Sequence, residues 1–590
     1  MASDRPANQS RLTRFAIVGA YLRINILRIV GGCLAVLCSI GLALVAPYII
    51  KSIFELLEQG EPLERLVPRV LLLLAISAIS GAMAFVSRKT FLALGRDVEF
   101  SLRRDLMAHL TRLPILFYRQ TRTGEIMARL NSDVEAVRRM IGNGMLHAAE
   151  TILTFLIALP MMIYLSPKLT LYSLAPAIVL PILTNRLGNA IHARYIPIQR
   201  KYAEMTTAVQ ENLAGTRIVR AYRQEGAQVD GFTKLSNEYI SLNLRLARLL
   251  GIFFPLTMFT ASLLMLSTFY FGGLEVIRGD IPLGTLVAFF VYLGLLFWPL
   301  FAMGGLISMY ERGTVSLDRL KELFAEQQEA APGEMTSMPR SIKGHIEFKD
   351  LCFGYNAQHA VLENISFTAE PGQVVGITGP TGSGKTTMVS LLPKLFPCES
   401  GQIFVDGIDI NSWDSDTLRR NIAYATQEAF LFSDTIASNI DLGRPDGTEA
   451  DIKHAATIAA LIDDAGNSDI KLDEIVGERG VMLSGGQKQR TSLARAINRS
   501  APILILDDVT SAVDSETEAR ILDAIRKNIT AGTTFIISQR VSTLNNADVI
   551  LYLEKGRIIE SGTFDDLIKR DGPFAAMYRM QKLSEELDVS

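Results

Sequence analysis

The residues best suited to chemistry form a glycine-rich run at 379–386, whose sequence GPTGSGKT fits the pattern G-x-x-x-x-G-K-[ST]. In such a loop, backbone N–H groups close around phosphate oxygens, the lysine adds a mobile positive charge, and the following hydroxyl reaches a magnesium ion. The run QVVGIT before it is typical of a strand, and TMVSLL after it is typical of a helix. Because the positive end of that helix faces the phosphates, the context predicts a nucleotide site. Its predicted members are Gly379, Pro380, Thr381, Gly382, Ser383, Gly384, Lys385, Thr386 and Thr387.

Two runs further along the chain supply additional chemistry. ILILDD at 503–508 has the pattern of a buried strand that ends in two carboxylates. Asp507 is suited to hold magnesium through water, and Asp508 lies where a base orients an attacking water. Between the loop and this strand, LSGGQKQR at 483–490 precedes a predicted helix, and its glycines and Ser484 can offer N–H and O–H donors to a phosphate.

Six apolar runs precede this half of the chain, and each is bordered by charged or polar residues. Each one reaches or approaches the roughly 20 residues that span about 30 Å of hydrocarbon. Six such runs in succession argue against buried helices of a soluble core, and the prolines within them do not exclude helices, because neighbouring helices satisfy the freed backbone groups. The predicted spans are Ile29–Ile50, Val70–Ser87, Thr151–Pro167, Leu169–Asn185, Leu249–Leu274 and Ile281–Tyr310.

The composition agrees with a membrane protein. Apolar residues make up 49% of the 590 residues, and the mean hydropathy is +0.24. The formal net charge of -2 gives no indication of a nucleic-acid partner. Four cysteines show no paired spacing, and the polar N-terminus lacks the short apolar core of a signal peptide.

The distribution of basic residues predicts the orientation. The N-terminal segment and the loop 91–150 are rich in arginine, whereas the connection 55–64 is acidic. The termini and both long loops, 91–150 and 186–248, are therefore expected in the cytoplasm. Both loops have helical periodicity and are expected to extend below the membrane, with bends at 121–124 and 213–215. The tips near Arg122–Glu125 and Gly215–Arg217 are candidates for contact with the nucleotide domain.

The six spans contain almost no ionisable side chains, which argues against a proton relay and favours an apolar or amphipathic substrate, such as a drug-like compound, a lipid or a peptide. The fifth and sixth spans are rich in aromatic residues and methionine. These side chains are candidates for core packing, lipid contact or a substrate pocket. They are Phe253, Phe254, Met258, Phe259, Phe269, Tyr270, Phe289, Phe290, Tyr292 and Phe297.

With these motifs, essentially the whole chain from about Arg14 to Leu583 closely resembles the ATP-binding cassette (ABC) transporters, specifically the exporters that fuse six membrane helices to one nucleotide domain. The resemblance implies an all-α transmembrane domain over 1–325, a linker over 326–343 and an α/β P-loop domain over 344–590. It implies ATP and Mg²⁺ as ligands, and it places the protein in the bacterial cytoplasmic membrane.

Several residues take their expected roles from this resemblance. Tyr355 matches the aromatic residue that stacks on adenine, and Gln427 matches the glutamine that contacts magnesium and water. Asp514 matches the loop that crosses the dimer interface, and 476–480 (VGERG) matches a segment that touches the membrane-domain loops. Thr386, Gln427 and Asp507 are the expected metal ligands. The family signature corresponds to Leu483, Ser484, Gly485, Gly486 and Gln487. In this family each ATP lies between one chain's phosphate loop and the other chain's signature.

Two positions depart from the family pattern. Asp508 stands where the family has glutamate, and Gln539 stands where it has histidine. The shorter side chain retracts the carboxylate by roughly 1.5 Å, and glutamine carries no protonic charge. Both changes impair hydrolysis at one site, whereas the signature is intact and would serve the other ATP. The sequence therefore favours a heterodimer with a second half-transporter, with a homodimer as the alternative.

The leading interpretation is an ATP-driven exporter subunit with Asp508, Gln539 and Gln427 at its catalytic centre. A nucleotide-gated channel or regulatory membrane protein on the same scaffold is an alternative, since it needs little hydrolysis. An importer on the exporter fold is a third. The sequence leaves the substrate and the partner subunit unidentified.

Overall fold

The chain divides into two compact units. The computed structural model describes residues 16–329, 342–355, 359–463, 470–477, 480–528 and 532–588. The first unit comprises 1–112 and 121–326, and the second comprises 113–120 and 327–590. The predicted linker, 326–343, lies mostly outside the described residues, and so do Glu478 and Arg479 of the predicted contact segment 476–480.

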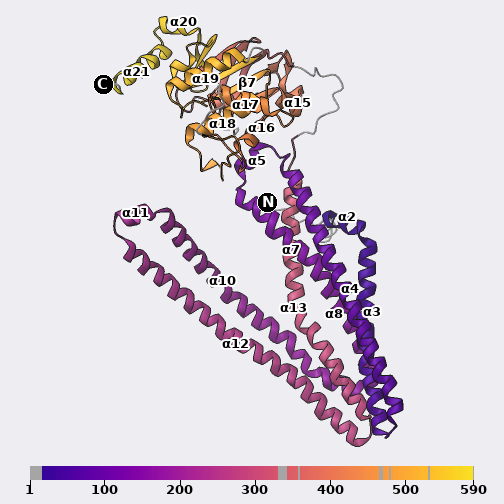
Figure 1. Ribbon diagram of the computed structural model, residues 1–590. Helices are drawn as coiled ribbons and strands as arrows, with labels where there is room; N and C mark the ends of the chain where they lie inside the picture. Colours follow the sequence, from indigo (N-terminus) through magenta and orange to yellow (C-terminus); the bar gives the residue numbers. More distant parts are fainter. Residues whose placement is uncertain are drawn as a thin grey trace. The chain divides into compact units, whose positions relative to one another are not determined.

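The first unit is all-helical (Figure 1). Its elements are α2 (Ala16–Ile24), α3 (Ile26–Glu58), α4 (Leu63–Leu110), α6 (Thr123–Ala128), the π-helical turn η1 (Arg129–Asp133), α7 (Val134–Arg139), the π-helical turn η2 (Met140–Gly144), α8 (Met145–Leu165), α9 (Pro167–Leu174), the 3-10 turn η3 (Ala175–Ile178), α10 (Val179–Ala214), α11 (Thr216–Ala221), α12 (Glu225–Arg278) and α13 (Leu283–Ala325).

Among the described residues, five helical stretches are long and apolar enough to cross a membrane. They are Ile26–Glu58, Leu63–Leu110, Thr123–Leu165, Glu225–Arg278 and Leu283–Ala325. The fourth predicted span, Leu169–Asn185, is not one continuous α-helix, because the 3-10 turn η3 separates α9 from α10. Pro176 lies in this turn, and proline removes a backbone donor and clashes with the preceding turn of an α-helix. By contrast, Pro160, Pro255 and Pro299 lie within continuous helices.

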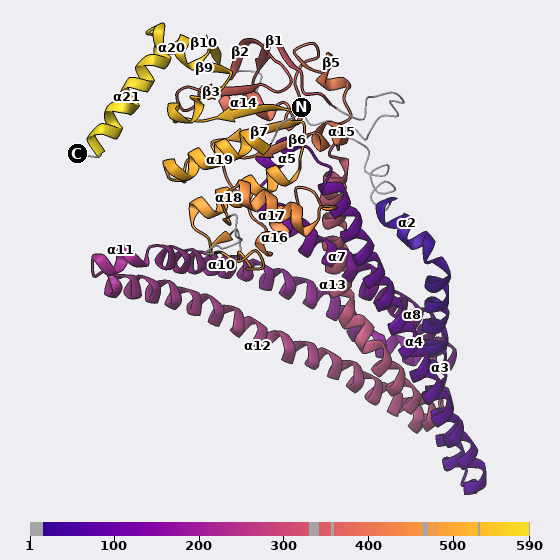
Figure 2. The same cartoon turned by 45° about the horizontal axis from the view of Figure 1, so that its top comes forward.

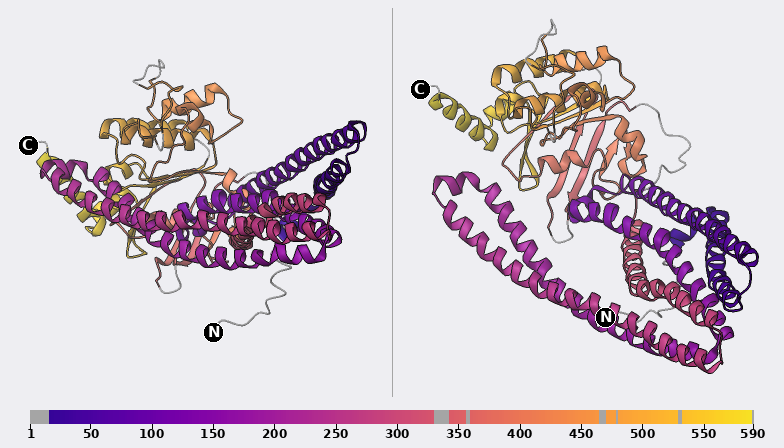
Figure 3. Two further views of the ribbon diagram at one scale, coloured as in Figure 1. Left: turned by 90° about the horizontal axis from the view of Figure 1, so that it is seen from below. Right: turned by 60° about the horizontal axis from the view of Figure 1, so that its bottom comes forward.

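The long loops form helices that continue far beyond the apolar segments, as the periodicity predicts. Helix α4 has 48 residues and α12 has 54, so at about 1.5 Å per residue they measure about 72 and 81 Å, against about 30 Å of hydrocarbon. Helices α10 and α12 run side by side as a hairpin with α11 at its tip (Figures 1, 2 and 3). The break between α10 and α11 falls at Gly215, and a second break separates α5 (Ile115–Gln120) from α6, so both predicted bends are confirmed.

The cytoplasmic extensions are held together by a buried carboxylate. The Glu99 side chain on α4 is 8% exposed, and it forms ion pairs with Arg96, Arg103 and Arg138 at N···O distances of 3.0, 3.0 and 3.4 Å. Since Arg138 belongs to α7, the cluster ties two segments that are separate in the sequence. Charges on mostly polar helices give no periodic signal, so this cluster was not predicted.

The second unit contains two sheets. The six-stranded sheet has the order β10-β9-β3-β8-β7-β6, and all its pairings are parallel except β10 with β9. The smaller sheet, β2-β1-β4-β5, is antiparallel. The strands are β1 (Ile346–Phe353), β2 (Leu362–Ala369), β3 (Val374–Thr378), β4 (Ile403–Val405), β5 (Ile408–Asp409), β6 (Ile422–Ala425), β7 (Ile503–Asp507), β8 (Thr533–Ile537), β9 (Val549–Glu554) and β10 (Arg557–Gly562).

Helices interleave with these strands (Figure 2). Besides α5, they are α14 (Lys385–Ser390), the 3-10 turn η4 (Ile410–Ser412), α15 (Ser415–Arg420), α16 (Ile436–Asp441), α17 (Glu449–Ile458), α18 (Gly485–Asn498), α19 (Ser515–Asn528), the 3-10 turn η6 (Val541–Leu544), α20 (Phe564–Lys569) and α21 (Pro573–Asp588). Strand β7 is buried at every position, as an apolar run in a parallel sheet covered on both faces requires. The predicted fold class, an all-α membrane domain plus an α/β nucleotide domain, is therefore confirmed.

Candidate nucleotide site

The topology of the larger sheet brings the predicted chemical residues to one edge. Strands β3, β8 and β7 are parallel neighbours, so their carboxyl ends lie side by side. The glycine-rich loop follows β3, Gln539 follows β8, and Asp507 ends β7. Ligands of open parallel sheets bind at this edge. Asp508 continues from β7 with φ +51°, a left-handed conformation that is uncommon for residues other than glycine and that aspartate adopts more readily than most.

Two glycines of the loop occupy places where no side chain fits. Gly379 has φ +138°, and a Cβ there would collide with the carbonyl oxygen of Leu553. Gly384 has φ +100° and is the N-cap of α14, where a Cβ would lie 2.6 Å from Leu362 Cδ2. The loop thus passes against two strands before α14 begins, and only glycine permits both the conformation and the approach.

The Lys385 side chain folds back over its own loop. Its Nζ donates to the carbonyl oxygens of Gly379 and Pro380 at 2.8 Å, and Ser383 Oγ lies 3.5 Å away. Burial lowers the pKa of Lys385, while the charges of Asp508 and Asp507 act in the opposite direction. An ammonium held by two carbonyl oxygens and one hydroxyl, all neutral, is available to exchange them for phosphate oxygens, which are stronger acceptors.

Asp507 is anchored by two hydroxyl groups. Thr386 Oγ1 donates to one carboxylate oxygen at 3.0 Å, and the Tyr424 hydroxyl donates to the other at 3.3 Å. Burial raises the pKa of Asp507, and these two hydrogen bonds oppose that effect. The paired hydroxyl and carboxylate are hard oxygen donors of the kind that Mg²⁺ prefers.

Asp508 sits beside Asp507 and faces Gln427 and Lys385. Gln427 lines the same cavity as Asp508. Burial raises the pKa of Asp508, while Gln427 and the positive charges of Lys385 and Arg540 lower it. A carboxylate in such surroundings accepts a proton only from a water molecule within its reach, and the length of the side chain sets that reach.

These side chains line one cavity of about 240 Å³. The predicted residues that the structure brings together there are Thr381, Gly382, Ser383, Gly384, Lys385, Thr386, Thr387, Gln427, Asp507, Asp508 and Gln539. Gly379 and Pro380 are connected to this cavity because their carbonyl oxygens accept hydrogen bonds from Lys385 Nζ. The signature residues 483–487 and Asp514 do not line this cavity.

Tyr355 lies beside the start of α14 within an aromatic cluster. Its hydroxyl is 3.0 Å from Thr387 Oγ1, and its ring makes T-shaped contacts with Phe353 and Phe396 at centroid distances of 5.2 and 5.0 Å. The Arg119 guanidinium of α5 lies over the ring at 4.3 Å from its centroid. This segment, 113–120, groups with the second unit, and it lies just before the predicted tip Arg122–Glu125.

The signature forms the start of α18. Ser484 is the N-cap, with Ser484 Oγ accepting from the Gln487 N–H at 3.3 Å and Gln487 Oε1 accepting from the Ser484 N–H at 2.8 Å. This capping box is the local reason for the Ser-x-x-Gln spacing. A Cβ at Gly486 would lie 2.8 Å from the Ala512 carbonyl oxygen. The signature therefore packs directly against the loop 511–514.

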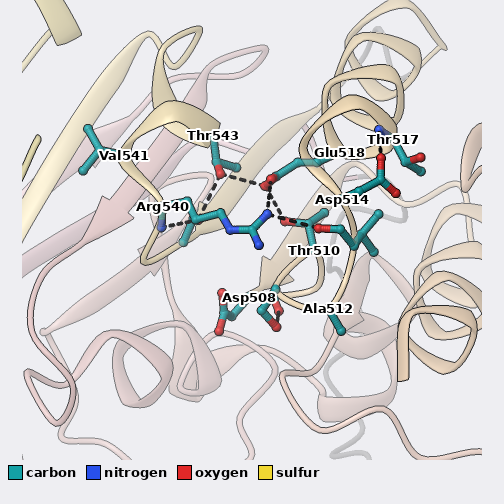
Figure 4. A network of polar contacts seen from close by, with 12 residues as sticks. Asp508, Thr510, Ala512, Asp514, Thr517, Glu518, Arg540, Val541 and Thr543 are labelled. Atoms are coloured by element: carbon teal, nitrogen blue, oxygen red, sulfur yellow. Dashed lines mark hydrogen bonds and ion pairs between the residues drawn. The ribbon is translucent and has the colours of Figure 1, made fainter. Parts of the chain in front are cut away.

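A buried carboxylate that sequence reasoning missed holds this loop and the segment after β8 together (Figure 4). Glu518 Oε1 accepts from Thr510 Oγ1 at 2.6 Å and from Thr543 Oγ1 at 2.7 Å, and Oε2 accepts from Arg540 at 2.9 Å. Arg540 also donates to the Val513 carbonyl oxygen at 3.1 Å. The signal available in the sequence was only a glutamate in the first turn of a helix.

Comparison with known proteins identifies the family. A profile of the ABC transporter transmembrane region matches residues 29–300, and a profile named ABC transporter matches residues 362–511. The multidrug resistance-like ATP-binding protein MdlA of Escherichia coli is 34% identical over 97% of this chain and 98% of its own length. The chain belongs to the ABC transporter family. The named resemblance is thereby confirmed.

Further comparisons agree on the exporter type. The probable multidrug resistance ABC transporter ATP-binding/permease protein YheI of Bacillus subtilis is 37% identical over 82% of this chain and 83% of its own length. A bacterial Atm1-family ABC exporter structure with ATP bound has a TM-score of 0.78 at 26% identity, over 95% of this chain and 99% of the other. This protein is thus a multi-pass membrane ABC exporter that binds ATP and couples its hydrolysis to transport.

Proposed function

We propose that this ABC exporter subunit pairs with a different half-transporter and that the ATP site built on its own phosphate loop hydrolyses slowly. The observation that carries the proposal is the pair Asp508 and Gln539, which line the same cavity as Lys385. The family pattern has glutamate and histidine at these positions. Both departures therefore affect a single site, and neither affects the signature.

Physical chemistry supports slow hydrolysis at this site. An aspartate carboxylate stands back by about one C–C bond, roughly 1.5 Å, from the place that a glutamate reaches. A misplacement of about 1 Å can cost on the order of 100-fold in rate. Gln539 can donate a hydrogen bond but no proton.

The proposed metal ligands are Thr386, Asp507 and Gln427. Thr386 Oγ1 and Asp507 are already 3.0 Å apart, and all three side chains offer oxygen, which is the donor that Mg²⁺ selects. Bound Mg²⁺ would neutralise phosphate charge. The Thr386 hydroxyl would then exchange its hydrogen bond to Asp507 for the metal, and Asp507 would remain to hold the metal's water.

The proposed substrate is an apolar or amphipathic compound. The membrane unit has a cavity of about 390 Å³ with a mostly apolar lining that includes Met258, Met265, Leu293, Phe297 and Leu300. Phe289 and Tyr292 are instead fully buried core residues, whereas Phe259, Phe269 and Tyr270 are about 60% exposed. The Phe254 side chain lies outside the described residues. The two relatives named above are described as multidrug resistance-type proteins, which supports this substrate class.

The first test restores the family residues. The purified chain alone is expected to hydrolyse ATP slowly, and Asp508→Glu combined with Gln539→His is expected to raise its turnover on the order of 100-fold. Asp523→Glu is the matched control, because it adds the same methylene group on the exposed face of α19 and should change nothing. A wild-type chain that turns over rapidly by itself, and stops on Asp508→Asn, would show that Asp508 is a working base and that no heterodimer is needed.

The second test uses the transporter co-purified with its partner. Ser484→Arg should nearly abolish turnover, because it blocks the signature that serves the active site. Asp508→Asn should change turnover little, since its site contributes little. Replacing the partner's catalytic glutamate with glutamine should also nearly abolish turnover. If Asp508→Asn is as damaging as Ser484→Arg, the two sites are equivalent and the asymmetry is absent.

A further inference from the structure

Helix α5 places a cation on the aromatic ring that is proposed to stack on the base. Arg119 Cζ lies 4.3 Å from the centroid of Tyr355 and 5.6 Å from that of Phe396. Arg119 is exposed and comes from the connection between α4 and α6, which belong to the membrane unit. The ring is therefore shared between the nucleotide site and a segment that runs directly into the membrane helices.

The Tyr355 ring cannot easily turn away from this contact. Its hydroxyl is hydrogen-bonded to Thr387 at 3.0 Å, and Phe353 and Phe396 pack against it in T-shaped geometry. Arg119, in contrast, is a long side chain at an exposed position. When another group binds to the face of the Tyr355 ring, the Arg119 side chain therefore moves away and the ring stays in place.

We propose that Arg119 and the base of the nucleotide compete for the face of Tyr355. Base binding then releases Arg119, and α5 loses its contact with the ring. A cation over a ring at an exposed site contributes about two- to fivefold in an equilibrium constant. Stacking of a base on an aromatic side chain contributes more than this. The base therefore displaces Arg119 from the ring. The affinity for ATP is lower than it would be without Arg119, because the contact between Arg119 and Tyr355 must first be broken.

This inference rests on the proposed role of Tyr355 as the base-stacking residue. Arg119 is then a specificity-determining residue, because its contact opposes any ligand that uses the ring and is indifferent to one that uses only the phosphate loop. The two classes are represented by ATP and by inorganic tripolyphosphate. Competition with Arg119 lowers the affinity for ATP and leaves the affinity for tripolyphosphate unchanged.

The experiment measures binding of both ligands to the purified full-length chain without Mg²⁺, so that hydrolysis does not interfere. Arg119→Ala and Arg119→Gln are expected to tighten ATP binding about two- to fivefold and to leave tripolyphosphate binding unchanged. Arg122→Ala is the control, since it removes an exposed arginine three residues further on. In a Tyr355→Leu background, ATP binding should be weaker and Arg119→Ala should have no further effect.

The possible outcomes are distinct. Weaker ATP binding in the Arg119 variants would show that the guanidinium supports the base, which overturns the competition. Unchanged ATP binding in those variants, with weaker binding in Tyr355→Leu, would overturn the competition and leave the base site standing. If Tyr355→Leu itself has no effect, the base site is misassigned and the competition fails with it. Tripolyphosphate binding that shifts with ATP binding would place the effect at the phosphate loop instead.

Discussion

The carboxylate of Glu518 is expected to control the local stability of the two loops that border the catalytic centre. Glu518→Gln retains the size of the side chain but removes its charge, so Arg540 loses its ionic partner. The Glu518 side chain is 6% exposed and Arg540 is 42% exposed. A hydrogen bond to a charged group is worth about 1.5–3 kcal/mol against about 1 for a neutral one. Because water can hydrate Arg540 in the variant, part of this energy is recovered. We therefore expect the local free energy of unfolding of the two loops to fall by about 1–2 kcal/mol.

This loss should appear as faster hydrogen exchange in the affected loops. With about 1.4 kcal/mol for each factor of ten, exchange of the amides in 508–514 and 539–543 should accelerate about 5- to 30-fold in the nucleotide-free, full-length protein. Glu518→Ala should have a larger effect, because Thr510 and Thr543 then also lose their acceptor. Glu516→Gln, at an exposed position in the same turn of α19, is the matched control. Equal exchange rates in Glu518→Gln and Glu516→Gln would refute the reasoning.

Three further outcomes are expected. Lys385→Ala should weaken ATP binding at this chain's own site, and unchanged labelling by a photoreactive ATP analogue would contradict that role. Gly486→Val should displace the loop at Ala512, because even a Cβ would approach its carbonyl oxygen to 2.8 Å; turnover of the assembled transporter should fall while photolabelling of this chain stays intact. Burial raises the folded-state pKa of Asp508, so its ionised carboxylate costs stability above that pKa; Asp508→Asn should therefore raise the melting temperature of the nucleotide-free protein at neutral pH. This gain should vanish as the pH falls through the raised pKa toward about 4, and a gain that persists in acid would contradict the assignment.

The nucleotide site was largely predictable because its parts are short and their spacing is local. The run 379–386 combines a strand, glycines and a helix start within a few residues. The carboxylates at 507–508 end a strand of uninterrupted apolar residues. Parallel strands then bring such segments to one edge of the sheet without further information. Gln427, Tyr355 and Gln539 carried no local signal of this kind and were predicted only through the family resemblance.

Other features depend on contacts between distant residues and could not be predicted. Glu99 with its three arginines, Glu518 with Arg540, and Arg119 over Tyr355 all join charged side chains that resemble ordinary surface residues in the sequence. The break of the fourth span at Pro176 was missed for a different reason. Prolines within apolar runs are tolerated when neighbouring helices satisfy the backbone, and the composition alone does not tell which proline will end a helix.

The contacts around the loop 511–514 explain why a weakly hydrolytic site would still need its architecture. Gln489 of α18 donates to Ser511 Oγ at 2.9 Å and accepts from the Ala512 N–H at 2.9 Å, so the signature helix is tied to this loop. Arg540 ties the same loop to the segment that follows Gln539. A continuous set of hydrogen bonds therefore joins the segment after β8, which contains Gln539, to the signature helix α18. In the proposed heterodimer, loss of the catalytic glutamate and histidine leaves this connection complete. Selection can therefore relax the chemistry of one site while it retains the residues that position the signature for the other.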